Sequence, residues 1–340
     1  MGVCMLCSFV ISANASVLGS IDADDTVTLN PESGLRLTDS PADAFAVGYN
    51  MSTKATYYYG TSAAVLTENA EDGIIEEGWT PPGMQTADFG DQVDPNAIIG
   101  EDGRTLVTDT GSTPHAAICA IYTIFRNLSN PNDEALVLST GWLISPNAVV
   151  TAGHALHTLA DGWAVEVYIT PGASHWDIGL APYGRCKATE IVISKQYYES
   201  KDEDHDWGLI RMESNLGSLT GYLGFRSYTV GTLTGYDVYT MGYPDDKNPE
   251  RQKAWNCYQY QSEGVVTADS GASTVSREIQ HNMDTYTGNS GGPVMRSATV
   301  IAIHRGNRVT TVNGTTTVVN VAVAFTNNMV TFFRAYKNNS

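Results

Sequence analysis

The sequence of 340 residues predicts an all-β fold with one helix near its C-terminus. Two observations support this prediction: short apolar runs recur between turn residues from position 114 onward, and no convincing long helical pattern precedes residue 327. Short strands at regular intervals are typical of sandwiches and barrels. The predicted strands span residues 116–125, 136–144, 148–152, 165–170, 189–194, 207–212, 238–243, 263–267, 292–295, 300–304 and 318–324.

The C-terminal stretch 327–336 has the apolar spacing of an amphipathic helix. An apolar content of 42% in a chain of this length is enough for a well-buried core and an accessory segment.

Charge separates the first part of the chain from the rest. Residues 1–96 hold 14 Asp and Glu against 2 Lys and Arg, so they carry 12 of the 18 net negative charges. Turn-forming residues at 79–83 and 94–96 interrupt this region, which we interpret as an acidic propeptide spanning residues 16–96. A negative chain without a basic stripe cannot gain affinity by releasing phosphate counterions, so we expect no nucleic-acid partner.

Residues 1–15 are apolar and end in Ala13-Asn14-Ala15, the small-x-small pattern of a signal-peptide cleavage site. No positive leader precedes them, which leaves open a signal peptide truncated at its start or, alternatively, a buried strand or helix. The apolar run is too short to span a membrane comfortably. We therefore expect a secreted, extracellular protein without stable membrane association.

Five cysteines occur, of which Cys4 and Cys7 lie in the predicted signal peptide. The remaining Cys119, Cys186 and Cys257 allow at most one intramolecular bridge, and the sequence does not choose the pair. None has a CxxC partner, so we predict no metal site, and nothing in the sequence indicates a cofactor.

Candidate catalytic residues stand out in two motifs. Residues 287–293 read Thr-Gly-Asn-Ser-Gly-Gly-Pro around Ser290, and residues 151–154 read Thr-Ala-Gly-His, ending in His154. A serine hydroxyl needs an imidazole to accept its proton and backbone N–H groups to receive the oxyanion. Glycines beside Ser290 allow a tight turn in which the N–H groups of Gly288 and Ser290 face one point. The two motifs together predict a serine peptidase.

The third catalytic residue is expected to be an aspartate at the edge of a buried strand. Asp206 follows an acidic run and precedes the apolar stretch 207–212, so we prefer it over Asp204. The chain order His154, Asp206, Ser290 is that of chymotrypsin-like enzymes.

Beyond the triad, four stretches resemble the bacterial chymotrypsin-like glutamyl endopeptidases. They are residues 98–104 with 107–110, residues 141–144, residues 241–244, and the serine loop with residues 302–306. The resemblance covers residues 97–335 and implies a trypsin-like serine protease domain at 97–340. It also implies a chymotrypsin-like double β-barrel in which His154 and Asp206 come from the first barrel and Ser290 from the second.

The same resemblance implies cleavage after glutamate, and less well after aspartate, through an acyl-enzyme. In the family, a histidine at the position of His304 and a hydroxyl at that of Thr285 contact the substrate carboxylate. The mature family N-terminus corresponds to Ala97, whose freed α-amino group approaches the substrate pocket, so cleavage after Asn96 is predicted to activate the enzyme.

Two alternatives stay open from the sequence. The chain is either a trypsin-like peptidase of another specificity or a catalytically silent homologue that binds peptides. Protein or peptide substrates are the expected partners in each case, and we expect a monomer.

Overall fold

The computed structural model describes residues 29, 33, 35–61, 73–85, 101–130, 132–174, 181–229, 231–247, 257–271, 273, 276–312 and 315–339. The predicted signal peptide and the predicted cleavage site between Asn96 and Ala97 lie outside these residues.

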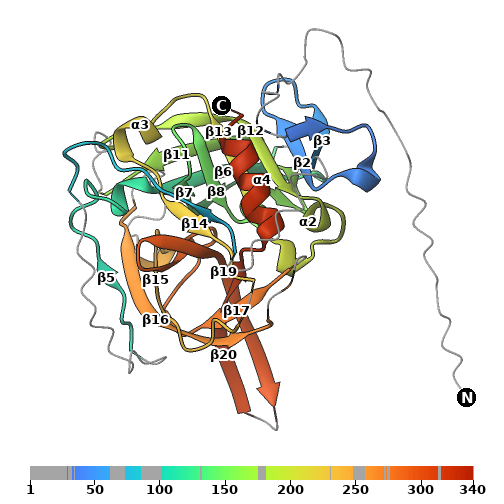
Figure 1. Ribbon diagram of the computed structural model, residues 1–340. Coiled ribbons are helices and arrows are strands. Elements are labelled where there is room, and N and C mark those ends of the chain that lie inside the picture. Colours follow the sequence, from blue (N-terminus) through green and yellow to red (C-terminus); the bar gives the residue numbers. More distant parts are fainter. Residues whose placement is uncertain are drawn as a thin grey trace, which may run out of the picture.

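The first barrel is a closed antiparallel sheet of six strands (Figure 1). In the sheet they run in the order β12, β11, β6, β7, β8, β13, and β13 pairs with β12 to close the barrel. The strands are β6 (Ile118–Arg126), β7 (Glu134–Leu143), β8 (Ala148–Thr151), β11 (Glu166–Pro171), β12 (Cys186–Ser194) and β13 (Gly208–Met212).

The second barrel is built in the same way. Its strands run in the order β18, β15, β16, β17, β20, β19, and β18 pairs with β19 to close it. They are β15 (Asp237–Gly242), β16 (Tyr260–Asp269), β17 (Glu278–His281), β18 (Pro293–Arg296), β19 (Thr299–Val312) and β20 (Thr315–Ala324). The short β14 (Gly224–Arg226) lies parallel to β19.

The all-β double barrel with a C-terminal helix, predicted from the sequence, is confirmed. All eleven strands expected from apolar runs are present, although their bounds shift by several residues at some ends. The sequence did not predict β17, because Glu278-Ile-Gln-His281 reads as a polar segment. Its Glu278 and His281 are buried only because other strands supply their partners.

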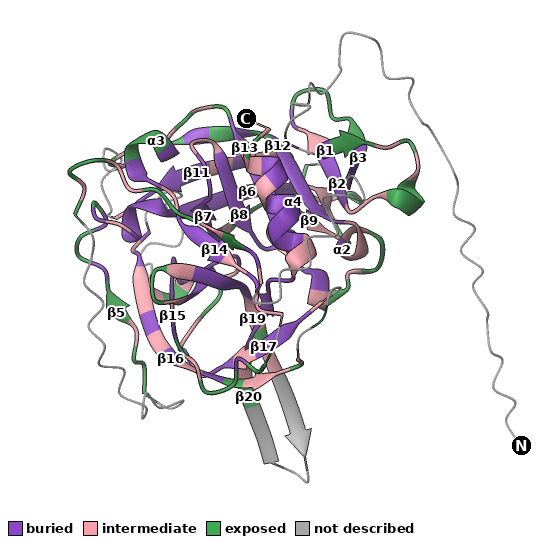
Figure 2. Ribbon diagram, viewed as in Figure 1, coloured by how far each residue is buried: buried purple, intermediate pink, exposed green. Residues whose placement is uncertain are grey.

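Helix α4 (Asn327–Lys337) packs its apolar face against both barrels. Phe332, Phe333 and Tyr336 are fully buried, and both phenylalanine rings contact Trp207 of the first barrel. Figure 2 shows the middle of the helix in the buried class. The Oγ1 of Thr326 caps its first turn by accepting the N–H of Met329.

Four of the described strands lie in the predicted propeptide, and the sequence did not predict any of them. They are β1 (Leu35–Leu37), β2 (Ala46–Asn50), β3 (Thr56–Thr61) and β4 (Ile75–Glu76). The first three continue the sheet of the first barrel beyond β12, whereas β4 pairs with β14 beside the second (Figure 1).

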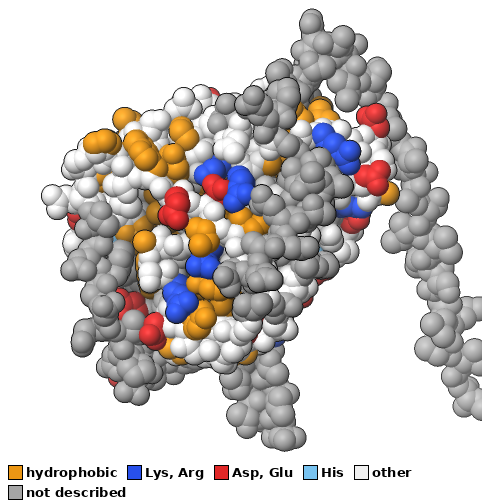
Figure 3. Space-filling view, viewed as in Figure 1, with side chains coloured by type: hydrophobic (Ala, Val, Ile, Leu, Met, Phe, Trp, Pro, Cys, Tyr) orange, Lys and Arg blue, Asp and Glu red, His pale blue; other side chains and the backbone are white. Residues whose placement is uncertain are grey.

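Short elements complete the described chain. They are β5 (Thr105–Leu106), β9 (His157–Thr158), β10 (Gly162–Trp163), α2 (Lys195–Ser200), α3 (Gly217–Thr220) and the 3-10 turns η2 (Pro41–Asp43), η3 (His115–Ala117), η4 (Gly153–Ala155), η5 (Glu203–His205) and η6 (Asp245–Lys247). No helix in the described ranges has both the length and the apolar character needed to cross a membrane. On the face that carries α4, basic, acidic and apolar side chains lie intermixed (Figure 3).

Candidate active site

His154 and Asp206 lie together at one edge of the first barrel. His154 sits in η4, directly after β8, and Asp206 follows η5, directly before β13, which pairs with β8. The Nδ1 of His154 is 2.6 Å from Oδ2 of Asp206, and the backbone N–H of His154 donates to Oδ1 at 2.8 Å. Both carboxylate oxygens therefore hold the histidine, one through its ring and one through its backbone.

The competing Asp204 does not contact His154. Its backbone N–H donates to the carboxylate of Asp202 within the acidic turn, whereas Asp206 is 4% exposed. The structure thus brings to His154 the aspartate that the sequence analysis preferred.

The electrostatic surroundings of His154 pull its pKa in opposite directions. Burial disfavours the imidazolium, but the charge of Asp206 and its hydrogen bond outweigh this effect, so the pKa is raised above its ordinary value. The cation of Arg305 works against the increase. The side chain of His154 keeps 36% of its surface exposed, which leaves it accessible to a substrate.

Ser290 lies in a glycine-rich loop before β18, on the second barrel. Gly288 and Gly291 have φ values of +99° and +88°, which strongly favour glycine. A Cβ on Gly288 would lie 2.2 Å from the carbonyl O of Tyr243, and one on Gly291 would lie 2.1 Å from that of Thr140. The loop therefore requires glycine at both positions, for backbone conformation as well as for space.

Backbone hydrogen bonds occupy three of the N–H groups around Ser290. The N–H groups of Asn289, Gly291 and Gly292 donate to Tyr286, His304 and Asn289 carbonyls respectively. In the part of the chain that the structure describes, no acceptor bonds the N–H of Gly288 or of Ser290. These two groups are the pair that the sequence analysis assigned to an oxyanion hole.

Thr140 of β7 holds the serine loop against the first barrel, a role that sequence reasoning missed. Its Oγ1 donates to the carbonyl O of Gly288 at 2.7 Å and accepts the N–H of Tyr243 at 3.0 Å. Its own N–H donates to the carbonyl O of Ser290 at 2.8 Å. A threonine in a strand gives no local signal of such contacts, because both partners lie more than 100 residues away.

The hydroxyl of Ser290 donates to the carbonyl O of Arg305 at 3.4 Å, and no hydrogen bond joins it to His154 within the described ranges. Contacts between a nucleophile and its base are often loose before substrate binds.

Arg305 is a second residue whose importance the sequence did not establish. Its side chain is 7% exposed and forms ion pairs with Glu203 at 2.7 Å and with Glu278 at 2.9 Å. Glu203 belongs to η5 beside Asp206, and Glu278 belongs to β17 of the second barrel. The guanidinium thus joins the aspartate turn of one barrel to a strand of the other.

His304 lies on β19, alongside the serine loop. Its backbone exchanges hydrogen bonds with Gly291 and Gly292, both at 2.8 Å, and its side chain is 2% exposed. Behind it, Nε2 of His281 is 3.2 Å from Nδ1 of His304. Burial lowers the pKa of His281 to about 3 and that of His304 well below its ordinary value, so both rings are neutral at neutral pH.

The other two predicted specificity residues are Thr285 and Ala97. Thr285 is half-buried five residues before Ser290, and its side chain forms no hydrogen bond to another described residue. Ala97 lies outside the described residues. Gly103, a few positions later, donates its N–H to Asp284 at 2.7 Å, and Asp284 precedes Thr285 directly in the sequence.

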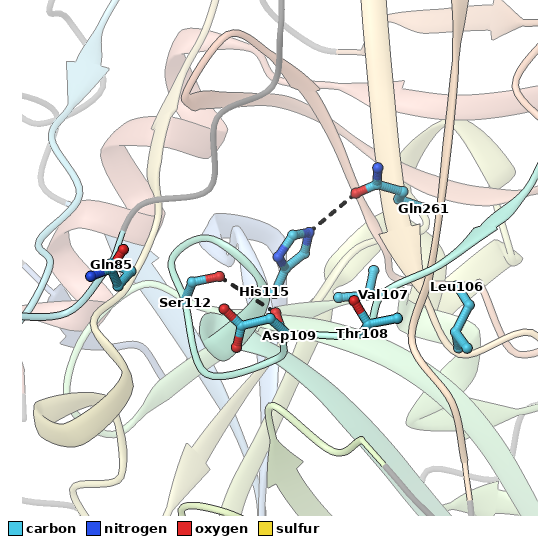
Figure 4. A pocket seen from close by; sticks show the side chains of 8 residues that line it. All are labelled: Gln85, Leu106, Val107, Thr108, Asp109, Ser112, His115 and Gln261. Atoms are coloured by element: carbon cyan, nitrogen blue, oxygen red, sulfur yellow. Dashed lines mark hydrogen bonds between the residues drawn. The ribbon is translucent and has the colours of Figure 1, made fainter.

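A hollow of about 290 Å³ lies near this N-terminal stretch, lined by Gln85, Leu106, Val107, Thr108, Asp109, Ser112, His115 and Gln261. In Figure 4, His115 and Gln261 point toward one another, and their Nε2 and Oε1 atoms are 3.2 Å apart. The triad candidates do not line this hollow, which is therefore separate from the site.

The three remaining cysteines are free, buried thiols. Burial raises the pKa of Cys186 and of Cys257 to about 12, and that of Cys119 well above its ordinary value. Across the described ranges, no three His, Cys, Asp or Glu side chains are grouped as they would be around a metal ion.

Comparisons with known proteins agree with this geometry. The chain is 31% identical over 286 residues to a protein of Bacillus subtilis (strain 168) named "Extracellular metalloprotease", covering 81% of this chain and 80% of that protein. It is 32% identical over 203 residues to the "Glutamyl endopeptidase" of Bacillus licheniformis, covering 59% of this chain but only 55% of that protein.

Among solved structures, a Glu endopeptidase in complex with MPD matches with a TM-score of 0.57 and 27% identity, covering 71% of this chain and 99% of that chain. The Trypsin family model matches residues 120–329, more than half of the sequence. The resemblance to chymotrypsin-like glutamyl endopeptidases is thereby confirmed, and the chain belongs to the trypsin family of serine peptidases.

Proposed function

We propose that the protein is a secreted serine endopeptidase in which Ser290 is the nucleophile, His154 the general base and Asp206 the residue that orients it. The proposal depends mainly on the two hydrogen bonds between His154 and the carboxylate of Asp206. In the serine loop, the N–H groups of Gly288 and Ser290 have no acceptor among the described residues. Export is supported by the signal-like start of the sequence and by the name of the extracellular relative.

The geometry supports the following acylation step. Ser290 rotates from the Arg305 carbonyl, and its oxygen attacks the substrate carbonyl carbon while Nε2 of His154 accepts its proton. Asp206 stabilises the imidazolium, and the N–H groups of Gly288 and Ser290 donate to the oxyanion. His154 then protonates the leaving amine, and water releases the acyl group by the reverse sequence of proton transfers.

Glutamate specificity is supported by the two buried histidines. If the N–H on Nε2 of His281 donates to Nδ1 of His304, the proton of His304 resides on its own Nε2. A neutral N–H is then available to a substrate carboxylate. A pocket that offers buried donors selects against substrates that leave them unpaired.

Peptides that differ only at the residue before the scissile bond test this specificity. We expect turnover with Glu, slower turnover with Asp, and little with Gln, Lys or Phe. The variant His304→Gln should lower kcat/KM for Glu peptides more than for Gln peptides. A preference of the unaltered enzyme for Arg, Lys or Phe would refute the proposal.

The variant Ser290→Ala tests the nucleophile, because it removes the attacking oxygen while changing packing little. We expect no turnover and no labelling by a fluorophosphonate, with an unchanged melting temperature. Labelling of the unaltered protein would exclude a silent homologue. Full activity after dialysis against a chelator would separate this mechanism from the metal dependence that the name of the Bacillus subtilis relative suggests.

We further propose that cleavage between Asn96 and Ala97 activates the enzyme and that the new α-amino group joins the specificity site. The hydrogen bond from Gly103 to Asp284 supports this, because it joins a residue early in the predicted mature domain to the sequence neighbour of Thr285. Three proteins test this: one that begins at Ala97, one that begins at Asn96 and one that keeps the whole predicted propeptide, residues 16–96. They should differ in activity toward Glu peptides. Equal activity of all three would refute this activation.

A further inference from the structure

The carboxylate of Glu190, on β12, is held by tyrosines from two distant parts of the chain. Its Oε1 accepts the hydroxyl of Tyr59 at 2.6 Å and also that of Tyr57, both from β3. Its Oε2 accepts the hydroxyl of Tyr336, from α4, at 2.8 Å. Glu190 is 9% exposed, and it forms no ion pair with another described residue. A buried carboxylate needs such donors, and two of the three lie in the predicted propeptide.

The backbone of β2 extends the same contact. Five residue pairs, from Glu190 with Asn50 to Ser194 with Ala46, join β2 to the second half of β12. Two aromatic contacts flank this pairing: Tyr49 stacks on Trp163 with ring centroids 5.2 Å apart, and Phe45 lies 5.1 Å from Phe332 of α4. Removing β2 would expose these rings and leave the edge of β12 unpaired.

A second group of contacts lies beside the other barrel. Glu76 of β4 forms ion pairs with Arg334 and, at 2.6 Å, with Lys337 of α4. Trp79 stacks on Tyr222 with centroids 5.6 Å apart, and their backbones exchange two hydrogen bonds of 2.8 Å. We call residues 35–61 and 73–85 the N-terminal clamp, because they grip the sheet of the first barrel, α4 and the strand that borders the second barrel.

None of the hydrogen bonds or ion pairs of the clamp involves His154, Asp206 or Ser290, as far as the described residues extend. The bonds that hold the clamp are therefore separate from the bonds of the three triad candidates. Its contacts with residues 101–339 also do not depend on the connecting peptide, since they are made by its own strands and side chains.

We propose that the N-terminal clamp remains bound after the chain is cut between Asn96 and Ala97, as a non-covalent second subunit of the active peptidase. The β12 edge, the Glu190 carboxylate and α4 together form its binding surface, and the hydroxyls of Tyr57 and Tyr59 identify the segment that fits it. This inference rests on the proposed activating cleavage, but retention after a cut can be measured whether or not that cleavage occurs naturally.

The test uses the full chain with Ser290→Ala, so that no self-cleavage occurs, and with residues 92–96 replaced by the recognition sequence of a sequence-specific protease. After cutting, we expect the fragment and residues 97–340 to elute together in native size-exclusion chromatography, at a one-to-one ratio by intact mass. Elution of the fragment alone, with the remainder folded at an unchanged melting temperature, would overturn the proposal.

Matched variants test the role of the tyrosines. The pair Tyr57→Phe and Tyr59→Phe should speed release of the cut fragment at least tenfold, whereas Tyr58→Phe, whose side chain points to the opposite face of β3, should not. Equal release rates for the double variant and for Tyr58→Phe would contradict the role assigned to the hydroxyls of Tyr57 and Tyr59. In the active enzyme, failure to cleave after Glu would contradict the proposed function while leaving retention unaffected.

Discussion

At the residue scale, the site depends on side chains that link the two barrels as much as on the triad candidates. Thr140 bonds the serine loop from the first barrel, and Arg305 of the second barrel bonds the turn that carries Asp206. Each contact fixes the position of one half of the site relative to the other.

We expect Thr140→Val to lower kcat/KM about 100-fold, because small displacements of a reacting group carry costs of this size. It should also lower the free energy of unfolding by about 1–3 kcal/mol, since the Gly288 carbonyl and the Tyr243 N–H lose their partner. Steady-state kinetics and urea unfolding measure the two effects.

Thr123→Val is the control for this variant. Thr123 is buried on β6 of the same barrel, and its hydroxyl has no partner in the described part of the chain. Its replacement should leave both quantities unchanged or slightly raise stability. The positioning role of Thr140 would be refuted by two variants that behave alike.

The second prediction concerns pH. Because the pKa of His154 is raised, kcat/KM should increase with pH through a value above about 6.5. Arg305→Gln removes a cation that lowers this pKa. In this variant, the rise of kcat/KM on the acidic side of the pH profile should therefore occur at still higher pH. Arg308→Gln is the matched control, since Arg308 shares Glu278 but is not among the charges that act on His154. An unchanged limb in Arg305→Gln would contradict this coupling.

The sequence was sufficient to nominate His154, Asp206 and Ser290, because each stands in a local motif and the structure brings His154 and Asp206 into contact. It was not sufficient for Thr140 or Arg305. Their partners are set by the docking of two barrels, and nothing in the residues next to them in the sequence differs from an ordinary strand.

At the scale of elements, the capping residue Thr326 stabilises the first turn of α4, a helix with a large buried face. We expect Thr326→Ala to lower the free energy of unfolding by about 1 kcal/mol, because the N–H of Met329 loses its acceptor. Thr326→Ser keeps the oxygen and should retain most of the stability. Chemical denaturation of the three proteins provides the measurement, and equal losses in both variants would rule out capping as the cause.

Elements with a clear apolar run were predictable, and those stabilised by distant partners were not. Tyr57, Tyr58 and Tyr59 have high strand propensity, so the sequence of β3 contains a local strand signal, although no strand was predicted there. In contrast, the sequence of β17 does not alternate between apolar and polar residues. Its Glu278 is buried because Arg305 and Arg308 neutralise the carboxylate.

At the scale of the whole molecule, stability should depend on pH through the buried histidines. His281 and His304 remain neutral in the folded state below their ordinary pKa, whereas the unfolded chain protonates them near pH 6.5. Their contribution is thus complete above about pH 6.5 and is lost as pH falls below it, in the case of His281 down to about pH 3. While a histidine stays neutral in the folded state only, it contributes a slope of about 1.4 kcal/mol per pH unit. His154 has the opposite sign: its contribution is lost as pH rises through its raised pKa.

Urea unfolding at a series of pH values measures this dependence. His281→Asn should make the free energy of unfolding fall less steeply as the pH decreases. The slope should decrease by about the contribution of one histidine. Parallel curves for the variant and the unaltered protein would show that acid sensitivity arises from other groups, such as Asp269, whose pKa is lowered to about 2.

The contact between Tyr57 and Glu190 joins positions 133 residues apart, which imposes an order of events on the protein's production. The clamp leaves the ribosome long before β12 exists, so its strands have no sheet to join during that interval. Closing so long a loop is costly in chain entropy, and it is easier while the two parts are one molecule than after they separate. Folding must therefore precede cutting, and a chain that is cut too early would have to find its own N-terminal part by diffusion.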